Sequence, residues 1–289
     1  MRGLRGDLWH MPTAILFPGQ GSQTPDMRER VAELRPDLLD LATEVVGEDP
    51  FARADDDTRF AQPAILAASL AGLTAMREEL GEPPAAVAGH SLGELTALAA
   101  AQAISERDAL RLAALRGRLM SESGARRGDG TMLAALGGDD ATVVGIAQQH
   151  GVTVANDNAP GQLVLSGERA ALQAAGTSLR EAGVRVLELN VAGAFHSPFM
   201  ADAVPDFAEA LGATYVRAPR IEVWSCVTAR PMDDVRRRLA EGLTAPVRWR
   251  ETVINLHEAG FDRFVDVGPG KVLAKLVKRI AKSAELVHA

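Results

Sequence analysis

Hydrophobic and polar positions along the chain change between strand-like and helix-like patterns. Short apolar runs, typical of buried strands, lie at 13–17, 85–89, 221–227 and 263–267. Apolar residues that return every three or four positions predict helices at 64–80, 94–104 and 108–120. Strands that alternate with helices in this way favour an α/β class with a parallel-sheet core.

The middle third of the chain has an order of its own. Its pattern predicts strand, helix, strand, strand, helix, strand at 131–136, 140–150, 152–156, 162–166, 169–182 and 184–191. This βαββαβ order is that of a ferredoxin-like unit, and it begins after the loop 126–130. We therefore predict a small domain inserted into the parallel core. Residues 1–12 precede the first strand and are expected to be an N-terminal extension.

Composition restricts the class of protein. Cys226 is the single cysteine, which excludes an intramolecular disulfide and a cysteine-rich zinc site, and the six histidines lack metal-ligand spacing. No apolar run approaches the roughly 18 residues of a membrane span, and no signal-peptide pattern is seen, so a cytoplasmic protein is expected. The net charge of −7 argues against nucleic-acid binding.

A candidate nucleophile lies where a predicted strand meets the next helix. Residues 89–93 read Gly-His-Ser-Leu-Gly, between the apolar run that ends at Gly89 and the helix from Glu94. A strand, sharp turn and helix hold a serine in an exposed elbow, and small residues two positions on either side permit that turn. We therefore predict that Ser91 is a nucleophile and that the Leu92 N–H faces a developing oxyanion.

A serine nucleophile needs a base. His90 is adjacent to Ser91, but a neighbouring residue of an elbow generally points elsewhere. His196 precedes a helix start with proline at its first position, where the positive helix end favours the neutral imidazole. We predict His196 as the base. No acidic third member is evident: Asp157 is the nearest candidate and Asp266 lies later, so a backbone carbonyl is the alternative partner of the imidazole.

Arg116 occupies an unusual place on the helix predicted over 108–120. At 100° per residue it falls in the middle of the apolar arc, whereas Arg111 and Arg118 fall on the polar flank. A guanidinium in a core needs a carboxylate partner, because an unpaired buried charge costs several kcal/mol. Two partners are possible: Glu94, in an internal ion pair, or the carboxylate of a substrate, held by the guanidinium fork.

Five motifs follow one another along the chain. They are FPGQGSQ at 17–23, GHSLGE at 89–94, RGRLM at 116–120, AFHSPFM at 194–200 and VGPGKVL at 267–273. Together they closely resemble the malonyl-CoA:acyl carrier protein transacylases of fatty acid and polyketide synthesis, over about residues 13–282. The resemblance implies an α/β-hydrolase-like core at 13–127 and 192–289 with a ferredoxin-like subdomain at 128–191.

The resemblance also implies roles for particular residues. Ser91 is the nucleophile, His196 the base, and the N–H groups of Gln20 and Leu92 form the oxyanion hole. Arg116 binds the malonyl carboxylate. No cofactor or metal is implied, since malonyl-CoA is a substrate.

Further site residues carried over from the resemblance are polar groups and one carbonyl. Gln62, Asn158 and Gln162 are expected at the pocket, although ordinary loop hydrogen bonding explains them equally well. The carbonyl that orients the histidine is expected at Gly242, four residues before the Pro246-Val247-Arg248-Trp249 motif, where the family has glutamine.

The implied partner is an acyl carrier protein, and carrier proteins of this pathway are acidic. All four lysines fall on one face of a helix, at Lys271, Lys275, Lys278 and Lys282. This face is either a docking surface or an ordinary solvated face. Arg180 and Arg185 of the small domain are rival docking residues. A monomer that binds neither nucleic acid nor a membrane is expected.

The expected activity is ping-pong transfer of malonyl from malonyl-CoA to the carrier protein through malonyl-Ser91. Phe195 before His196 matches the malonyl-type pattern. The alternatives within the family are a free-standing polyketide acyltransferase that uses malonyl or substituted malonyl units and a malonate decarboxylase component. A thioester hydrolase acting on carrier proteins would need the same serine and histidine. A non-enzymatic carrier-binding module would not require a nucleophile, a base and a buried arginine together.

Overall fold

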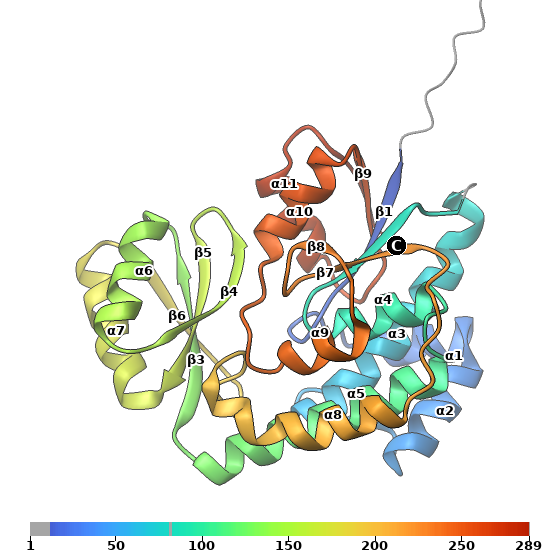
Figure 1. The fold of residues 1–289 in the computed structure, drawn as a ribbon, viewed down its shortest axis with the longest axis horizontal. Coiled ribbons are helices and arrows are strands. Elements are labelled where there is room, and N and C mark those ends of the chain that lie inside the picture. Colours follow the sequence, from blue (N-terminus) through green and yellow to red (C-terminus); the bar gives the residue numbers. More distant parts are fainter. Residues whose placement is uncertain (1–11, 81–82, 289) are drawn as a thin grey trace, which may run out of the picture.

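The computed structural model describes residues 12–80 and 83–288. One sheet has the strand order β10-β9-β1-β2-β7-β8, in which every neighbouring pair is parallel except the antiparallel pair of β7 and β8 (Figure 1). The strands are β1 Thr13–Phe17, β2 Ala86–Gly89, β7 Glu222–Ser225, β8 Arg230–Pro231, β9 Arg263–Asp266 and β10 Glu285–His288. The four expected apolar strands are confirmed within one or two residues at their ends.

Helices cover both faces of this sheet, because its central strands are apolar on both sides. Along β1, Ile15 and Phe17 belong to one core and Ala14 and Leu16 to another. The first core is completed by α1 Met27–Leu34, α2 Pro36–Val46, α3 Thr58–Leu80, α4 Gly93–Ala100, α5 Glu106–Arg127 and α8 Val204–Ala213. The second core is completed by α10 Trp249–Glu258 and α11 Val272–Ile280.

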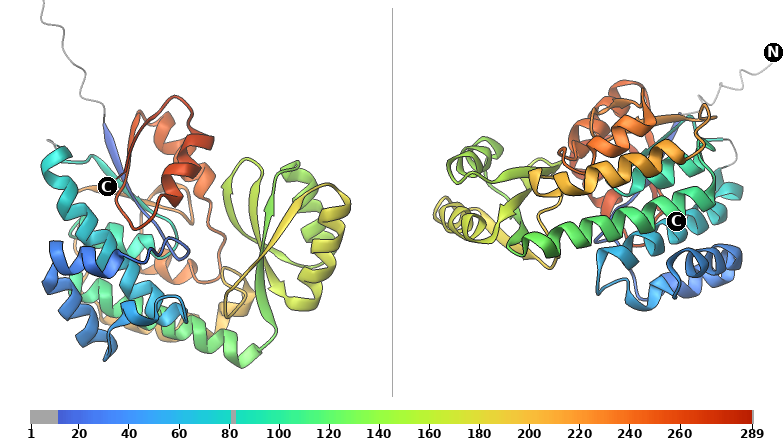
Figure 2. Two further views of the ribbon diagram at one scale, coloured as in Figure 1. Left: turned by 180° about the vertical axis from the view of Figure 1, so that it is seen from behind. Right: turned by 60° about the horizontal axis from the view of Figure 1, so that its bottom comes forward.

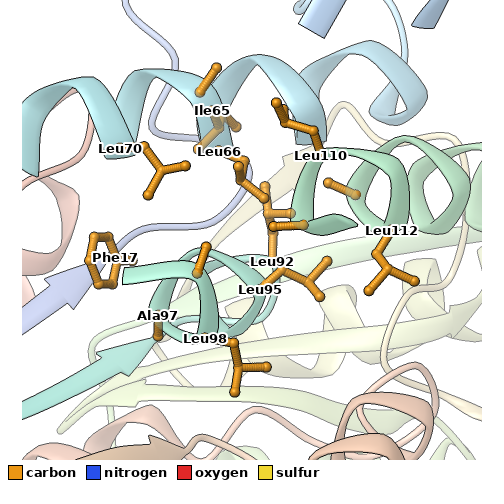
Figure 3. Packing of buried hydrophobic residues seen from close by; sticks show 14 of the residues in the cluster. Phe17, Ile65, Leu66, Leu70, Leu92, Leu95, Ala97, Leu98, Leu110 and Leu112 are labelled. Atoms are coloured by element: carbon orange, nitrogen blue, oxygen red, sulfur yellow. The ribbon is translucent and has the colours of Figure 1, made fainter. Parts of the chain in front are cut away.

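The short helix α4 is buried along its whole length up to Ala99, and its residues other than Glu94 and Thr96 are apolar or glycine. Leu92 and Leu95 lie beside apolar side chains of α3 and α5, and Leu98 belongs to the same core (Figure 3). The turn between β2 and α4 is thereby held between a central strand and two long helices. Such burial makes it a rigid support for a functional group.

A separate four-stranded antiparallel sheet has the order β4-β5-β3-β6. Its elements are β3 Gly130–Leu136, α6 Asp140–Gln149, β4 Thr153–Ala159, β5 Gln162–Glu168, α7 Arg169–Glu181 and β6 Arg185–Leu189. The helices α6 and α7 lie on the face directed away from the six-stranded sheet (Figure 2). The long helix α5 runs from the first core to this unit and leads into β3 (Figure 1). The strand and helix order expected for the middle third is confirmed.

Two elements differ from their predicted extents. The helix expected over 64–80 begins at Thr58, so Pro63 lies inside it rather than at its start. Asp57 caps this helix, since its carboxylate accepts the Arg59 N–H at 2.8 Å. The turn expected after Asn156 is partly strand, because β4 continues through two bulges to Ala159. The extension at 1–12 lies outside the described residues except for Pro12.

The middle of α3 lies very close to the segment that follows β9. A Cβ placed on Gly72 in the middle of α3 would lie 2.1 Å from the backbone oxygen of Val267. Because the obstructing atom belongs to the backbone, it cannot move aside as a flexible side chain would. Glycine is therefore required by packing at this position.

We expect Gly72→Ala to lower the free energy of unfolding by at least about 3 kcal/mol, because the helix must move away from Val267. Gly145→Ala is the matched control: it also lies in a helix interior, but a Cβ there meets nothing within 4 Å. That change should raise stability by about 0.5–1 kcal/mol. Urea denaturation measures both, and equal stability of the two variants would contradict the close approach.

Candidate active site

A cavity of about 490 Å³ lies between the carboxyl end of the parallel sheet and the four-stranded sheet. It is lined by the β2–α4 turn, the loop after β1, residues of α5 and α11, and strands of the smaller sheet. The structure brings eight sequence-predicted residues together on its wall: Gln20, Gln62, Ser91, Leu92, Arg116, Asn158, Gln162 and His196.

Ser91 occupies a strained elbow. Its φ is +53°, in the left-handed region that non-glycine residues rarely adopt. The flanking glycines are required, because a Cβ on Gly89 would lie 1.9 Å from the carbonyl carbon of Gly93. A Cβ on Gly93 would lie 2.0 Å from the oxygen of Phe17. The turn therefore forms only with small residues on both sides, and it directs the hydroxyl into the cavity.

The imidazole of His196 is the hydrogen-bond partner of the serine. Ser91 Oγ lies 2.8 Å from His196 Nε2, and His196 Nδ1 lies 3.2 Å from the carbonyl oxygen of Ala245. With Nδ1–H donating to that carbonyl, Nε2 is free to accept the serine proton. His196 itself has φ of +54°, so both members of the pair are held in sparsely populated backbone conformations.

The carbonyl that orients the imidazole is expected at Gly242, and the structure brings two carbonyls to this side of the ring. The hydrogen bond is made to Ala245, three residues later, and the Gly242 carbonyl is a second and smaller influence on the pKa of His196. Gly242 ends the helix α9 Val235–Glu241, and the chain continues in a further helical turn in which the Ala245 N–H donates to Glu241. Carbonyls three residues apart in such a turn point the same way, so spacing alone did not distinguish them.

Burial keeps the imidazole neutral. Burial, followed by the positive charge of Arg116 and the neighbouring His90, lowers the pKa of His196 to about 3, and the two backbone carbonyls oppose this only in part. The base is therefore unprotonated at neutral pH. Burial also lowers the pKa of His90, whose Nε2 lies 2.8 Å from Asn158 Oδ1 rather than near the serine.

Arg116 is buried, as the helical phase predicts, with 5% of its surface exposed. Its Nη1 donates to Gln62 Oε1 at 2.9 Å and its Nη2 donates to Ser91 Oγ at 3.0 Å. No carboxylate within ion-pair distance of Arg116 is found among the described residues. Burial accordingly lowers the pKa of the guanidinium to about 10. An ion pair with Glu94, the structural alternative, is not formed.

Glu94 instead ties the elbow helix to β7. Its Oε1 accepts the Ser225 hydroxyl at 2.9 Å and the Cys226 N–H at 2.8 Å, and burial raises the pKa of Glu94 to about 7. Cys226 is buried beneath the elbow, and burial raises the pKa of its thiol well above the ordinary value. Both groups therefore belong to the support of Ser91 rather than to the cavity wall.

Thr58 joins the predicted residues Gln20 and Gln62 through hydrogen bonds, and its own role was not predicted from the sequence. Its hydroxyl donates to Gln20 Oε1 at 2.6 Å and accepts from Gln62 Nε2 at 3.0 Å. Gln62 in turn accepts from Arg116, so the loop after β1 is connected through buried side chains to the serine. The signal was hidden because Thr58 precedes the predicted helix start and has no motif of its own.

The two residues expected to form an oxyanion hole, Gln20 and Leu92, both line the cavity beside Ser91. Gln20 follows Gly19, whose Cβ position lies 2.7 Å from the oxygen of His90, so the loop after β1 lies directly against the elbow. Neither the Gln20 nor the Leu92 N–H donates a hydrogen bond to another described residue. Two unpaired donors beside a nucleophile can stabilise an oxyanion.

The remaining predicted residues are hydrogen-bonded to groups other than Ser91 and His196. Gln162 lines the cavity but its amide oxygen accepts from Arg279 of α11, which also donates to the Pro160 carbonyl at 2.5 Å. Asp157 contacts Arg250 and not His196. Asp266 Oδ2 accepts the Ala274 N–H at the start of α11. The two acidic candidates for a third catalytic member are thus engaged elsewhere.

The candidate docking residues are all exposed. The structure places Lys271, Lys275, Lys278 and Lys282 along α11 and its ends, and Arg180 and Arg185 on α7 and β6. Within the described ranges, no cluster of three or more potential metal-binding side chains occurs, and no helix has the length and apolarity needed to cross a membrane.

Comparisons with known proteins agree with this geometry. A family model described as an acyl transferase domain matches residues 39–289. The polyketide biosynthesis protein ThaF of Burkholderia thailandensis is 41% identical over 280 residues, which cover 92% of this chain and 24% of that protein. The chain thus spans about a quarter of that relative.

Two further relatives match over nearly their whole length. The polyketide biosynthesis malonyl CoA-acyl carrier protein transacylase PksC of Bacillus subtilis is 38% identical over 93% of this chain and 97% of its own. The crystal structure of a malonyl-CoA:acyl carrier protein transacylase from Xanthomonas oryzae pv. oryzae superposes with a TM-score of 0.90 at 39% identity. It covers 96% of this chain and 94% of that one.

The lowered pKa of His196 gives a pH prediction that does not depend on the substrate. A fluorophosphonate, which reacts with activated serines, should label Ser91 at a nearly constant rate from about pH 8 to about pH 5. A lowered pKa keeps the base neutral until the pH approaches that pKa, whereas a histidine of pKa about 6.5 would lose about thirtyfold by pH 5. Labelling is followed by intact-mass spectrometry.

Two variants complete this experiment. Ser91→Ala should not be labelled, and His196→Gln should react at least about 100-fold more slowly. A labelling rate that titrates near pH 6.5 in the unmodified chain would show that the imidazole is not desolvated in solution.

Proposed function

The chain belongs to the acyl transferase domain family as a malonyl-CoA:acyl carrier protein transacylase, and from this we propose how its site works. It transfers a malonyl group from malonyl-CoA to the phosphopantetheine thiol of an acyl carrier protein. The reaction is a ping-pong exchange through malonyl-Ser91.

One observation carries the assignment of the substrate. The Arg116 guanidinium lies 3.0 Å from the nucleophilic oxygen, is buried, and has no carboxylate partner among the described residues. A malonyl thioester bound at Ser91 brings its free carboxylate to this region, one methylene beyond the reacting carbonyl. Arg116 can then exchange its neutral partners for the charge that it lacks.

In the first half of the reaction, Ser91 Oγ attacks the thioester carbonyl while His196 Nε2 takes its proton. The imidazolium is oriented by the Ala245 carbonyl, which accepts from Nδ1. The tetrahedral oxyanion is stabilised by the N–H groups of Gln20 and Leu92, each contributing about 2.7–4 kcal/mol by comparison with a lost oxyanion donor. CoA leaves with the proton that His196 returns.

In the second half, the thiol of the carrier protein attacks malonyl-Ser91. His196 takes the thiol proton and returns it to Ser91 Oγ as the ester bond breaks. The malonyl carboxylate stays on Arg116 throughout. Gln62 supports Arg116, and Asn158 holds His90 at the wall of the cavity. The steps need no metal ion or redox cofactor, because nucleophile, base and oxyanion donors all come from the chain.

We also propose the finer description of the fold. The parallel-sheet part, at 13–127 and 192–289, corresponds to an α/β-hydrolase-like core, supported by the strand, elbow and helix that carry Ser91. The insert at 128–191 is ferredoxin-like, supported by its βαββαβ order and antiparallel sheet. Gly128, with φ of +71°, ends α5 where the insert begins.

The carrier protein is proposed to dock at the entrance of the cavity. In support, α11 contributes Val272, Leu273 and Leu276 to the cavity wall and presents its lysines on the outer face. An acidic carrier would be attracted to this face although the chain is acidic overall. Arg185 on the edge strand β6 borders the same entrance, since Leu187 and Leu189 of that strand line the cavity. A monomer suffices for this arrangement.

The relatives also bear on whether the carrier protein belongs to polyketide or to fatty acid synthesis. Two relatives at 41% and 38% identity carry names from polyketide biosynthesis, which favours a carrier protein of a polyketide line over one of fatty acid synthesis. Hydrolysis of malonyl-Ser91 by water would need the same residues. The smaller sheet over the cavity and the buried base favour transfer, because both restrict water.

The acyl-enzyme can be tested directly by intact-mass spectrometry. After incubation with malonyl-CoA and before any carrier protein is added, we expect a malonyl adduct on the unmodified chain and none on Ser91→Ala. Acetyl-CoA should give no adduct, because it would leave Arg116 unpaired. Consumption of malonyl-CoA to free malonate without an adduct would indicate a hydrolase instead.

Substitution of the arginine tests its role separately. Arg116→Gln should reduce the preference for malonyl-CoA over acetyl-CoA by about 10²–10⁴, since pairing a buried charge is worth about 3–5 kcal/mol. Arg118→Gln is the matched control, because Arg118 is exposed on the same helix and pairs with Glu122. Rates of Ser91 acylation with the two thioesters give the ratio. An unchanged ratio in Arg116→Gln would assign the carboxylate to another group.

A further inference from the structure

The segment Ala245–Arg250 connects the two sheets at the active site. It leads from the turn after α9 into the first residues of α10, and its alternate residues contact different parts of the site. Ala245 accepts from His196 Nδ1, and Trp249 packs against the His90 ring at a centroid distance of 5.5 Å. One short segment thus holds the base and supports the residue before the nucleophile.

The same segment extends the smaller sheet. Its edge strand β4 pairs with Val247 in a parallel bridge: the Asp157 N–H donates to the Val247 carbonyl at 2.9 Å, and the Val247 N–H donates to Ala155 at 2.8 Å. The two bulges of β4 lie on either side of this contact. They direct Asn156 and Asn158 into the cavity and leave Asp157 facing Arg250.

Arg250 adds two ion pairs between α10 and the unit that contains the smaller sheet. Its Nε and Nη2 donate to Asp157 Oδ2 at 3.0 and 2.7 Å, and its Nη1 donates to Asp140 Oδ2 at 2.5 Å. All three side chains are only about one quarter exposed, so the two ion pairs are partly shielded from water. Asp140 also accepts the Gly161 N–H, which fixes the turn between β4 and β5.

We propose that Arg250 is a positioning residue, which sets the smaller sheet over Ser91 and thereby keeps the cavity closed around His196. The two aspartates belong to the smaller sheet and its first helix, whereas Arg250 belongs to α10 of the parallel core. When these pairs form, Asn158 reaches His90, and the wall of the cavity is complete. When they are lost, β4 keeps its two backbone bonds to Val247 and the contact of Asn158 with His90, and Arg279 still binds the turn after β4, but no ion pair joins β4 to α10.

The consequence is a change in the environment of the base. Water that enters beside β4 would reduce the desolvation of His196, which is the first cause of its lowered pKa. The other charged or titratable groups that face this imidazole are Arg116 from α5 and His90 from the elbow, and neither contacts Arg250. The variants below leave both of them unchanged.

The test compares the pH dependence of fluorophosphonate labelling of Ser91 in three chains. In Arg250→Gln, the pH at which labelling falls to half its plateau should rise by at least about one unit, so that labelling near that pH falls about tenfold. Arg248→Gln is the matched control, because Arg248 lies in the same segment but is exposed, and its side chain forms its ion pair with Glu251 of α10 and donates otherwise to the Thr228 carbonyl, with no bond to the smaller sheet in the described part of the chain. It should keep the original profile.

Two further variants separate positioning from simple loss of stability. Arg250→Lys keeps a charge but cannot pair with both aspartates in the same geometry, so its profile should lie between those of the original chain and Arg250→Gln. In the Arg250→Gln background, Asp157→Asn removes the carboxylate that has lost its partner. The pH of half-maximal labelling should then move part of the way back toward that of the original chain. If Arg250→Gln does not fold, Asp140→Asn takes its place, because it removes one of the two ion pairs.

An unchanged pH profile in folded Arg250→Gln would overturn the inference. A lower labelling amplitude with the original profile would also overturn it, because partial unfolding alone changes the amount of active protein and not the pKa of the base. The inference rests on the proposed function only for its meaning in malonyl transfer. The probe needs neither malonyl-CoA nor a carrier protein, so failure of that transfer and failure of the positioning role give different results.

Discussion

The site depends on one positive charge that is held in an apolar interior. Arg116 projects from the apolar face of α5 and donates only to neutral oxygens, those of Gln62 and Ser91. Its charge helps to lower the pKa of His196, which keeps the base neutral, and its hydrogen bond fixes the serine oxygen on the side opposite the imidazole. In the proposed reaction a substrate carboxylate would pair with this charge, which has no acidic partner among the described residues, and selectivity for an acid would follow from that pairing.

Rigid support is needed because the two reacting side chains occupy unfavourable backbone conformations. Ser91 and His196 both have φ near +54°, a conformation that costs about 1–3 kcal/mol for each residue. The elbow is compensated by the packing of α4 against α3 and α5, with Glu94 joined to β7 (Figure 3). His196 is held by its bond to Ala245 and by the 3-10 helix that follows it, Pro198–Ala203. The backbone strain at Ser91 and His196 is thus compensated by packed elements on both sides of the site.

The sequence predicts residues whose role follows from local constraints. Ser91 is recognisable because a strained elbow tolerates only small neighbours, and Arg116 because a charge on the apolar arc of a helix has no structural reason of its own. Thr58 and Arg250 escape prediction, since each acts through partners about 40 or more positions away or hidden in another element. Ala245 was missed for a different reason: any residue supplies a carbonyl, and only the backbone path after α9 decides which one reaches the imidazole.

The buried guanidinium also explains why the base is oriented by a carbonyl and not by an acid. A carboxylate at His196 Nδ1 would lie on the far side of an imidazole that Arg116 reaches through the Ser91 oxygen, near enough for the two opposite charges to attract each other. Such a carboxylate would compete with the substrate for the arginine and would raise the pKa of the imidazole. Asp157 and Asp266, the two acidic candidates for a third catalytic member, are bound to Arg250 and to the start of α11. A neutral carbonyl therefore orients the ring without competing for the arginine, to which the proposed reaction assigns the malonyl carboxylate.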